Sequence, residues 1–378
     1  MVPTDGFRRK PDFEKRQQPR AADLWQNPLH VVREHVAQVR QPRVYRKMER
    51  VAPAKGLYAS DEPIRIGVSS CLLGEEVRFD GGHKRSEFLT ETLGRFVEFV
   101  PVCPELEIGL GVPRESIRLV RGPDHAAAIR LVGNKTGLDH TDKMHAYAER
   151  RTAALGREEL SGYVLKKDSP SCGMERVRVY GPSGMPARDG AGLFASALMR
   201  RYPSLPVEEE GRLNDPHLRE NFVERVFAYR RLRSFFSARW TLGGLVQFHT
   251  AHKLVLMAHS PKAYSELGRF VANAKRLARD RVRDDYELAF MDALKKVATT
   301  ARHTNVLHHM LGYLRERLDA TARSELVTLI DDYHRGLVPL IVPITLFRHY
   351  VREFGITYLR GQVYLEPHPK ELMLRNHV

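Results

Sequence analysis

The chain has 378 residues, of which 42% are hydrophobic and 28% are charged, and it contains three cysteines. This length and apolar content allow a substantial core and favour two domains over one. The sequence has no stretch typical of a membrane span, and its Arg-rich N-terminus lacks the apolar segment of a secretory signal. Because an odd number of thiols fits a reducing compartment better than a secreted protein, we expect a cytoplasmic protein.

The formal net charge of +15 is unevenly distributed along the chain. Residues 1–60 hold 13 Lys and Arg against 6 Asp and Glu, residues 61–208 hold 21 against 21, and residues 209–378 hold 27 against 19. A neutral central segment flanked by basic ones favours a polyanionic partner, most simply nucleic acid.

Residues 1–60 mix Pro, Gln, Arg and Lys with few aromatic residues. Only residues 27–39 show weak helical periodicity, so we predict a basic, mostly disordered leader. The alternative is that translation begins at Met48 and that the residues before it are not part of the protein. We assign no function to this segment.

Strand-like and helical patterns alternate over residues 61–205. Such alternation predicts an α/β domain with a Rossmann-like parallel sheet and crossover helices. The expected strands are 64–70, 96–102, 127–132, 162–165 and 177–180, and the expected helices are 86–95, 141–154 and 192–202.

Proline and a charge run at residues 203–212 interrupt this pattern and predict a linker. From there to the C-terminus strand signals are nearly absent, which predicts an all-α helical domain over residues 206–378. Its expected helices are 215–233, 242–259, 260–275, 284–300, 305–318, 320–336 and 342–354.

Each of the three cysteines follows a predicted strand. Cys71 ends the first strand, Cys103 ends the second, and Cys172 lies between Pro170 and Gly173 on a sharp loop after the fourth. A parallel sheet would place all three thiols along one carboxyl edge, where α/β proteins bind their ligands. The spacings of 32 and 69 residues exclude a zinc finger or ribbon, whose ligands come in close pairs.

Three soft thiolates favour an iron–sulfur cluster, with zinc completed by a histidine such as His83 as the alternative. A cubane cluster usually takes four cysteines, so three would leave one iron open as a Lewis acid with affinity for sulfur. Three unrelated buried thiols are a further alternative. The small and hydroxyl-bearing neighbours of the cysteines favour the cluster, because they let backbone N–H groups approach its sulfur atoms.

Four motifs over about residues 62–205 closely resemble the thiouracil desulfidase (TudS) family. They are Ser69-Ser-Cys-Leu-Leu-Gly, Val77-Arg-Phe-Asp-Gly-Gly, Pro101-Val-Cys-Pro-Glu with Gly109-Leu-Gly-Val-Pro-Arg, and Ser169-Pro-Ser-Cys-Gly. Residues 231–378 look like the helical domain that is found fused to it. That two-domain combination is similar to the RNA 4-thiouridine desulfidases.

The resemblance implies a 4Fe-4S cluster held by Cys71, Cys103 and Cys172, with the fourth iron left for the sulfur of the substrate. It also implies catalytic roles for Glu105 and Ser169. The expected reaction converts 4-thiouridine in RNA, with tRNA as the expected substrate, to uridine and hydrosulfide. Glu105, two residues after a ligand, could shuttle protons to water, the ring nitrogen or the leaving sulfur, and Ser169 could hydrogen-bond the pyrimidine.

Four further residues are candidates for substrate binding: Asp80, Arg114, Lys166 and Ser171. Ordinary structural roles compete with these interpretations. Glu105 could cap a helix that opens after Pro104, and the two serines could be turn hydroxyls. Asp80 could shape an Asx turn, and Lys166 with Lys167 could form a solvated charge pair.

In the helical domain the RNA-binding candidates are Lys253, Lys275, Arg276, Arg279 and Arg283. The last four lie with Arg281 in a basic stretch that we expect to span about two helical turns, although a solvated helix face is an even alternative.

Trp240 and Tyr264 could stack on unpaired bases or belong to the core. His249 and Lys253 are expected on one helix face, with His252 turned away. Of His308 and His309, one is expected to be buried and the other exposed.

Two rival functions remain open. One is a desulfidase of free thiouracil or other small thioamides, with the helical domain serving oligomerisation. The other is a non-enzymatic iron–sulfur sensor that binds nucleic acid. For an RNA substrate, the thionucleoside must be loosened or extruded before its sulfur can reach a metal.

Overall fold

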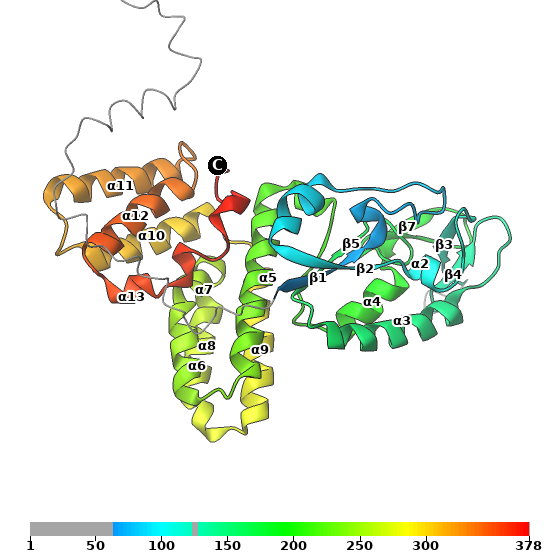
Figure 1. Ribbon diagram of the computed structural model, residues 1–378, viewed down its shortest axis with the longest axis horizontal. Helices are drawn as coiled ribbons and strands as arrows, with labels where there is room; N and C mark the ends of the chain where they lie inside the picture. Colours follow the sequence, from blue (N-terminus) through cyan, green and yellow to red (C-terminus); the bar gives the residue numbers. More distant parts are fainter. Residues whose placement is uncertain (1–62, 123–127, 378) are drawn as a thin grey trace, which may run out of the picture. The chain divides into compact units, whose positions relative to one another are not determined.

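The computed structural model describes residues 63–122 and 128–377 (Figure 1). The predicted leader, with its weak helical periodicity at residues 27–39, lies outside the described residues. None of the helices in the described ranges combines the length and the apolar character needed to cross a membrane.

A four-stranded parallel sheet forms the centre of the N-terminal part and confirms the predicted α/β fold. Its strand order is β2-β1-β5-β8, and every pair of neighbours is parallel. The strands are β1 (Ile64–Ser69), β2 (Val97–Val102), β5 (Gly162–Leu165) and β8 (Val207–Glu209).

Two of the three predicted crossover helices are present, as α3 (Thr141–Leu155) and α4 (Leu193–Arg201). The third, expected at residues 86–95, is instead a π-helical turn, η4 (Phe88–Thr92), followed by a 3-10 turn, η5 (Leu93–Arg95). Two threonines and a glycine within this short segment lower its α-helix propensity.

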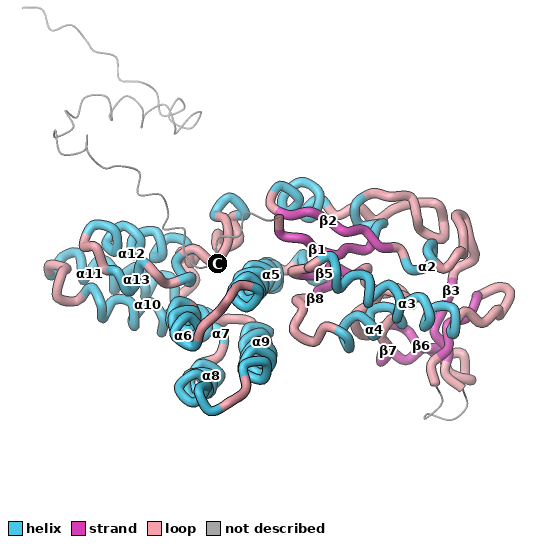
Figure 2. Tube along the Cα trace, turned by 60° about the horizontal axis from the view of Figure 1, so that its bottom comes forward, coloured by secondary structure: helices cyan, strands magenta, loops and turns pink. Residues whose placement is uncertain are grey.

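Helices cover both faces of the parallel sheet (Figure 2). On one face, Tyr163 of β5 packs 6.1 Å from the ring of Phe194 on α4, which lies 6.0 Å from the ring of Tyr147 on α3. On the other face, α5 (Pro216–Ser237) packs with η4 and η5 against Val164 and its neighbours in β1. Burial on both faces explains the uninterrupted apolar run of β5.

A second, mixed sheet differs from the prediction. Its order is β4-β3-β6-β7, with β3 and β6 parallel and the two outer pairs antiparallel. The expectation of one parallel sheet is therefore wrong for the runs at 127–132 and 177–180, which belong here. The strands β3 and β7 were not predicted: β3 has only four residues, and β7 begins with a proline and carries two charged residues. The four strands are β3 (Ile117–Val120), β4 (Arg130–Gly133), β6 (Val177–Tyr180) and β7 (Pro186–Gly190).

The segment predicted as a linker, 203–212, contains strand β8. Val207, Glu208 and Glu209 are all buried there, although the charge run resembled an exposed connection. The parallel sheet therefore extends beyond residue 205, and α5 packs on it. The division of the chain between residues 205 and 206 stays a prediction.

The remaining residues are helical, as predicted. The helices after α5 are α6 (Leu242–Ala251), α7 (Lys253–His259), α8 (Pro261–Asn273), α9 (Arg279–Lys295), α10 (Thr300–Leu314), α11 (Ala320–His334), α12 (Ile341–Glu353) and α13 (Thr357–Arg360). Side-chain oxygens of Asp215, Thr241, Ser260, Thr299 and Asp319 accept backbone N–H groups at five helix starts.

The single helix expected at 242–259 is divided at His252, between α6 and α7. Gln362 satisfies backbone groups at the break: its Nε2 donates to the carbonyl of Thr250 at 2.9 Å, and its Oε1 accepts the N–H of Leu254 at 3.4 Å. A contact from a distant residue therefore stabilises the break, and no proline or glycine marks it.

Candidate active site

The ends of three adjacent strands bring the cysteines to one edge of the parallel sheet, as predicted. Cys71 lies in a 3-10 turn after β1, η3 (Ser70–Leu73), and Cys103 precedes the short helix α2 (Pro104–Glu107) after β2. Cys172 lies on the loop after β5. Because β1 lies between β2 and β5, this is the point where the chain changes direction in the sheet and where such sheets bind ligands.

A cavity of about 510 Å³ opens at this edge, lined by all three cysteines together with Glu105, Arg114, Lys166 and Ser169. Its volume lies within the range of small-molecule sites, roughly 300–1,000 Å³. The lining combines thiols, charged groups and apolar surface, as expected of a site that performs chemistry.

Burial affects all three thiols. It raises the pKa of Cys71 to about 11, while the nearby Lys166 acts in the opposite direction. Burial also raises the pKa of Cys103, and it raises that of Cys172 well above the ordinary value, with Glu105 and the other two cysteines adding to the increase. The free thiols are therefore protonated at neutral pH, and a metal must displace their protons to bind.

Three thiols on one cavity are the donor type that iron–sulfur clusters use. Within the described residues, no three or more His, Cys, Asp or Glu side chains converge on one metal ion. A cubane does not need such convergence, because each thiolate binds a different iron. His83, the expected fourth zinc ligand, is exposed, and its Nδ1 accepts the N–H of Arg85 at 3.2 Å.

The Cys172 loop, residues 166–174, is fixed by its own backbone and by the start of α4. The N–H of Gly173 donates to the carbonyl of Ser169 at 2.7 Å, and the N–H of Gly192 donates to the carbonyl of Gly173 at 2.8 Å. A Cβ on Gly192 would lie 2.4 Å from the carbonyl carbon of Ser171, so only glycine allows this approach. The third thiol thus has a rigid support.

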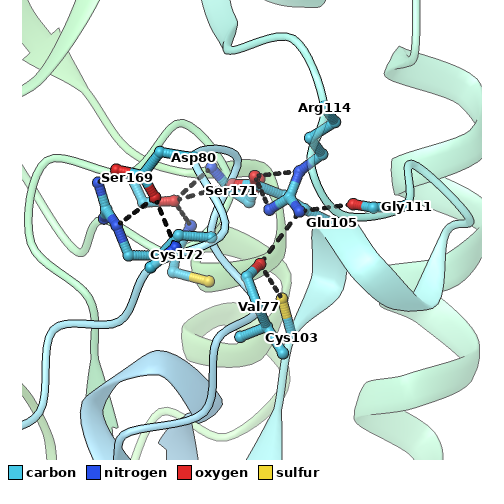
Figure 3. A network of polar contacts seen from close by, with 11 residues as sticks. Val77, Asp80, Cys103, Glu105, Gly111, Arg114, Ser169, Ser171 and Cys172 are labelled. Atoms are coloured by element: carbon cyan, nitrogen blue, oxygen red, sulfur yellow. Dashed lines mark hydrogen bonds and ion pairs between the residues drawn. The ribbon is translucent and has the colours of Figure 1, made fainter.

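Glu105 is held on the cavity wall by one cation and two hydroxyls (Figure 3). Its Oε2 pairs with Nη2 of Arg114 at 2.7 Å, and its Oε1 accepts hydrogen bonds from Ser171 Oγ at 3.0 Å and Ser169 Oγ at 3.4 Å. The Glu105 side chain is 15% exposed and that of Arg114 is 5% exposed. The carboxylate is therefore oriented before any ligand binds.

The alternative role of Glu105 as a helix cap is filled by another residue. Glu107 Oε1 accepts the N–H of Cys103 at 3.1 Å, at the start of α2. The Glu105 carboxylate makes its contacts with Arg114 and the two serines instead.

Ser169 combines the two roles considered for it. Its Oγ accepts the N–H groups of Ser171 at 3.2 Å and Cys172 at 3.1 Å, as a turn hydroxyl does, and it donates to Glu105. It also lines the cavity, whereas Ser171 is fully buried and does not. Ser171 therefore supports Glu105, and its role in substrate binding stays a prediction.

Known proteins share parts of this sequence and indicate its family. Residues 66–210 match the family model of 2-thiouracil desulfurase, and residues 253–369 match that of DUF1722, a protein family of unknown function. Protein YbbK of Bacillus subtilis strain 168 is 32% identical over 153 residues, which cover 98% of YbbK and 40% of this chain. The chain belongs to the 2-thiouracil desulfurase family.

Two further relatives complete the comparison of this desulfurase-family chain. Protein YbgA of Escherichia coli K12 is 37% identical over 153 residues, covering 90% of YbgA and 40% of this chain. A solved structure of the 4Fe-4S-dependent thiouracil desulfidase TudS is 31% identical, covers 40% of this chain and 94% of its own, and has a TM-score of 0.32. The two family models and the helices of the C-terminal part confirm the resemblance to a desulfidase domain followed by a helical domain.

Two substrate-binding candidates of this family member, Asp80 and Arg114, have partners within the protein. Asp80 is exposed and does not line the cavity; its Oδ1 accepts the N–H of Gly82 at 3.1 Å and pairs with Arg78 at 3.3 Å. The bond from Gly82 lowers the pKa of Asp80. This is the Asx turn considered as its alternative.

Arg114 lines the cavity, but its guanidinium is used within the protein. Besides Glu105, it contacts two carbonyls through Nη1: Val77 at 3.0 Å and Gly111 at 2.8 Å. The carbonyl of Val77 is also 3.8 Å from Cys103 Sγ. Arg114 therefore joins Glu105 to the loop beside Cys103, as a positioning residue.

Two residues outside the predicted site hold the Cys172 loop. Glu210 forms an ion pair with the Nζ of Lys166 and accepts the N–H of Lys167 at 2.7 Å. Glu209 Oε1 accepts the N–H of Met174 at 2.8 Å. The predicted solvated charge pair is therefore wrong for Lys166, which is mostly buried. The apolar residues before the acidic run were the sequence signal that these glutamates are not solvated.

Glu208, the first member of the same acidic run, faces the helical part. It pairs with Arg212 at 2.6 Å and with Arg225 of α5 at 3.6 Å, and both Glu208 and Arg225 are buried. The three consecutive glutamates thus divide between two tasks: Glu208 joins β8 to α5, and Glu209 and Glu210 anchor the cysteine loop.

The RNA-binding candidates of the helical part are not brought together as predicted. Lys275 and Arg276 lie in a 3-10 turn (Ala274–Arg276), and α9 begins only at Arg279, so the expected two-turn helical array is wrong. Arg279 lies over the ring of Trp240 at 4.4 Å, and Arg283 pairs with Asp284 at 2.8 Å.

The histidines near α6 belong to the packing. His249 and His252 are buried, and the ring of His252 lies 4.1 Å from that of Phe248. The expectation that His249 and Lys253 share one helix is wrong, because the break separates α6 from α7. His308 is exposed and His309 is half-buried.

Proposed function

We propose that this protein is a desulfidase that converts 4-thiouridine in RNA, most simply tRNA, to uridine and hydrosulfide, using a 4Fe-4S cluster held by Cys71, Cys103 and Cys172. The observation that carries the proposal is the convergence of three strand-end thiols on the same cavity as an oriented carboxylate. Membership of the 2-thiouracil desulfurase family supports removal of sulfur from a thiolated pyrimidine. A cytoplasmic location would suit the free thiols.

Three residues would hold the cluster and others would prepare its site. When bound through three protein thiolates, a cubane supplies one open iron, a Lewis acid with affinity for sulfur. The cation of Lys166 favours the ionised form of Cys71. Glu209 and Glu210 fix the loop that presents Cys172.

Glu105 is the group of this chain placed to move protons. In the reaction the C–S bond breaks, a C–O bond to water forms, and sulfur leaves as hydrosulfide with one of the two water protons while the other is released. Because Arg114 occupies Oε2, we assign proton transfer to Oε1. Ser169, which lines the cavity and donates to Oε1 at 3.4 Å, connects Glu105 with a bound pyrimidine.

The basic charge of the C-terminal part supports RNA as the carrier of the thiolated base. Residues 209–378 hold 27 Lys and Arg against 19 Asp and Glu. A base stacked within folded RNA must be extruded to enter the cavity, so contacts to the RNA outside the cavity have to stabilise that state. Binding should weaken steeply as the salt concentration rises.

A desulfidase of free thiouracil is the second candidate. The family description names 2-thiouracil, and a cavity of about 510 Å³ would accept a free base.

The test is an anaerobic purification followed by iron and acid-labile sulfide assays, with hydrosulfide release measured on thiolated tRNA and on free 4-thiouracil. We expect a coloured protein with equal amounts of iron and sulfide and faster turnover of the tRNA. A colourless protein with stoichiometric zinc would reject the cluster. Turnover of the free base alone would favour the second candidate, and a full cluster without turnover on either substrate would favour the sensor.

A further inference from the structure

Four helices of the C-terminal part bring one lysine and three tyrosines together. Lys253 begins α7, Tyr264 lies on α8, Tyr313 on α10 and Tyr358 on α13. The Nζ of Lys253 is 6.0 Å from the ring centroid of Tyr264 and 5.8 Å from that of Tyr358. The rings of Tyr358 and Tyr313 are stacked, with centroids 4.8 Å apart and an interplanar angle of 23°. We call these four residues the tyrosine–lysine patch.

The patch lies at the surface of the protein. Tyr313 is 38% exposed, and the other three members are half-buried. Each ring therefore packs on the helices with part of its surface and leaves part accessible. This arrangement differs from that of Tyr286 and Tyr364, whose rings are fully buried.

The charge at the patch is positive. Among the ion pairs formed between described residues, none involves Lys253, whose contacts are the two tyrosine rings. Burial and the charge of Lys253 together lower the pKa of the neighbouring His309. An anionic group that approaches the rings therefore meets a lysine that forms no ion pair with the described residues.

Accessible tyrosine faces beside an unpaired ammonium are the chemistry that binds unpaired nucleotides. Aromatic rings stack on bases of any sequence, and the cation meets the phosphate between them. An acidic peptide could pair a carboxylate with the lysine, but it would not offer flat bases that stack on the tyrosine rings. The ring stack therefore selects a nucleic acid.

We propose that the tyrosine–lysine patch binds unpaired RNA nucleotides, with Tyr264, Tyr313 and Tyr358 stacking on bases and Lys253 contacting a backbone phosphate. This inference rests on the proposed function, because it takes RNA as the substrate. It also moves the RNA contact away from residues 275–283. There, Arg279 already lies over Trp240 and Arg283 is paired with aspartate.

The experiment uses the full chain, purified anaerobically, and fluorescently labelled tRNA that carries 4-thiouridine. Tyr313→Leu and Tyr358→Leu should each raise the dissociation constant about 5- to 100-fold, the range for loss of one stacked base. Lys253→Gln should weaken binding and lower the salt-dependence slope by about 0.7, the value for one phosphate contact on a single strand. Turnover of the free 4-thiouridine nucleoside should not change.

Matched controls lie elsewhere on the helical part. Tyr350→Leu removes a ring that also stacks, on Phe354 at 5.7 Å, but whose surroundings are acidic, with Glu325 and Glu353 nearby. Lys262→Gln removes a highly exposed lysine of α8 outside the patch. Both variants should bind the RNA as the unchanged protein does.

The failures of the two proposals can be told apart. If the unchanged protein desulfurates the RNA and the patch variants bind it equally tightly, the patch is not the contact while the proposed function stands. If the unchanged protein neither binds nor desulfurates RNA, the RNA substrate is wrong and the patch proposal fails with it. Should a tyrosine variant fail to fold, Lys253→Gln, which leaves every ring in place, decides the question through its salt slope.

Discussion

Two regions of this protein hold buried carboxylates with arginine, and they differ in what surrounds the second carboxylate oxygen. At the sheet edge, Glu105 pairs with Arg114 through one oxygen and meets two serine hydroxyls with the other, beside a cavity of about 510 Å³. In the helical part, Glu220 pairs with Arg375 at 3.0 Å and with His377 at 3.0 Å. The free hydroxyl partners leave Oε1 of Glu105 able to take a proton, whereas the bond from His377 and the charge of Arg375 lower the pKa of Glu220 although burial raises it.

Glu224 completes the helical cluster and shows the effect of cations. It pairs with His259 at 3.3 Å and with Arg375 at 3.8 Å. Burial by itself raises the pKa of Glu224, but the bond and charge of His259 and the charge of Arg375 more than offset this and hold it well below the ordinary range. The neighbouring cavity is only about 190 Å³. We therefore assign chemistry to the sheet edge and stability to the helical cluster.

The largest expected effect is on turnover at the sheet edge. Glu105→Gln keeps the shape of the side chain but removes its ability to accept a proton, so turnover should fall about 10²- to 10⁴-fold. The absorbance of the cluster should persist. Unchanged turnover would contradict the proposed proton transfer.

Glu107→Gln is the matched control for Glu105. This residue lies on the same short helix, accepts the N–H of Cys103 at 3.1 Å and pairs with Arg151 at 3.4 Å. Its loss should lower the free energy of unfolding by about 1 kcal/mol, the usual contribution of a helix cap, with little change in turnover.

In the helical part the expected effect is on stability. Arg375→Met leaves Glu220 and Glu224 buried without their shared arginine, so the free energy of unfolding should fall by about 3–5 kcal/mol. Denaturant titration measures this change. If Arg375→Met instead abolished turnover of a free thiolated base without lowering stability, the contrast between the two regions would be wrong.

A smaller effect is expected for the residues that anchor the Cys172 loop. Glu209→Gln and Glu210→Gln each weaken a hydrogen bond between a carboxylate and a loop N–H, which should cost about 1–3 kcal/mol. We expect faster loss of iron to a chelator. Glu208→Gln is the control within the same run; because it faces Arg212 and Arg225, it should lower stability without speeding iron loss.

Stability should fall with decreasing pH, and this dependence should come mainly from the helical part. Burial lowers the pKa of His249 to about 4, of His252 to about 3 and of His303 to about 4. Their folded pKa values lie below the unfolded value of about 6.5, so the unfolded chain binds more protons as the pH falls from 6.5 towards 4. Each histidine should then remove roughly 1.4 kcal/mol of stability per pH unit.

Denaturant titrations at pH 7, 6 and 5 measure this slope. His303→Gln, which retains a polar side chain near the hydroxyl of Tyr364, should reduce it by the share of one histidine. An equal slope in the variant would assign the pH dependence to other groups.

The thiol positions could be predicted from the sequence because local signals determine them. Apolar runs before Cys71, Cys103 and Cys172 predict strands, and the rule that parallel strands share their carboxyl ends predicts the convergence. The seven helical patterns after residue 212 were recognisable for the same reason, since each carries its own period and most have a capping residue.

Features that depend on distant partners could not be predicted. A buried glutamate and an exposed one look the same in a sequence, so Glu208, Glu209 and Glu210 resembled a solvated linker. The break at His252 depends on Gln362, more than 100 residues later in the chain. The strand at 177–180 has the pattern of the first sheet but pairs with β3 and β7, since pairing is decided by space and not by the local pattern.

The position of β8 has a consequence for how the protein is made. The thiol of Cys172 is synthesised before the two carboxylates that anchor its loop, and these follow it by fewer than 40 residues. A fragment that stops at residue 205 lacks both carboxylates, so we expect it to hold the Cys172 loop less firmly than the full chain does.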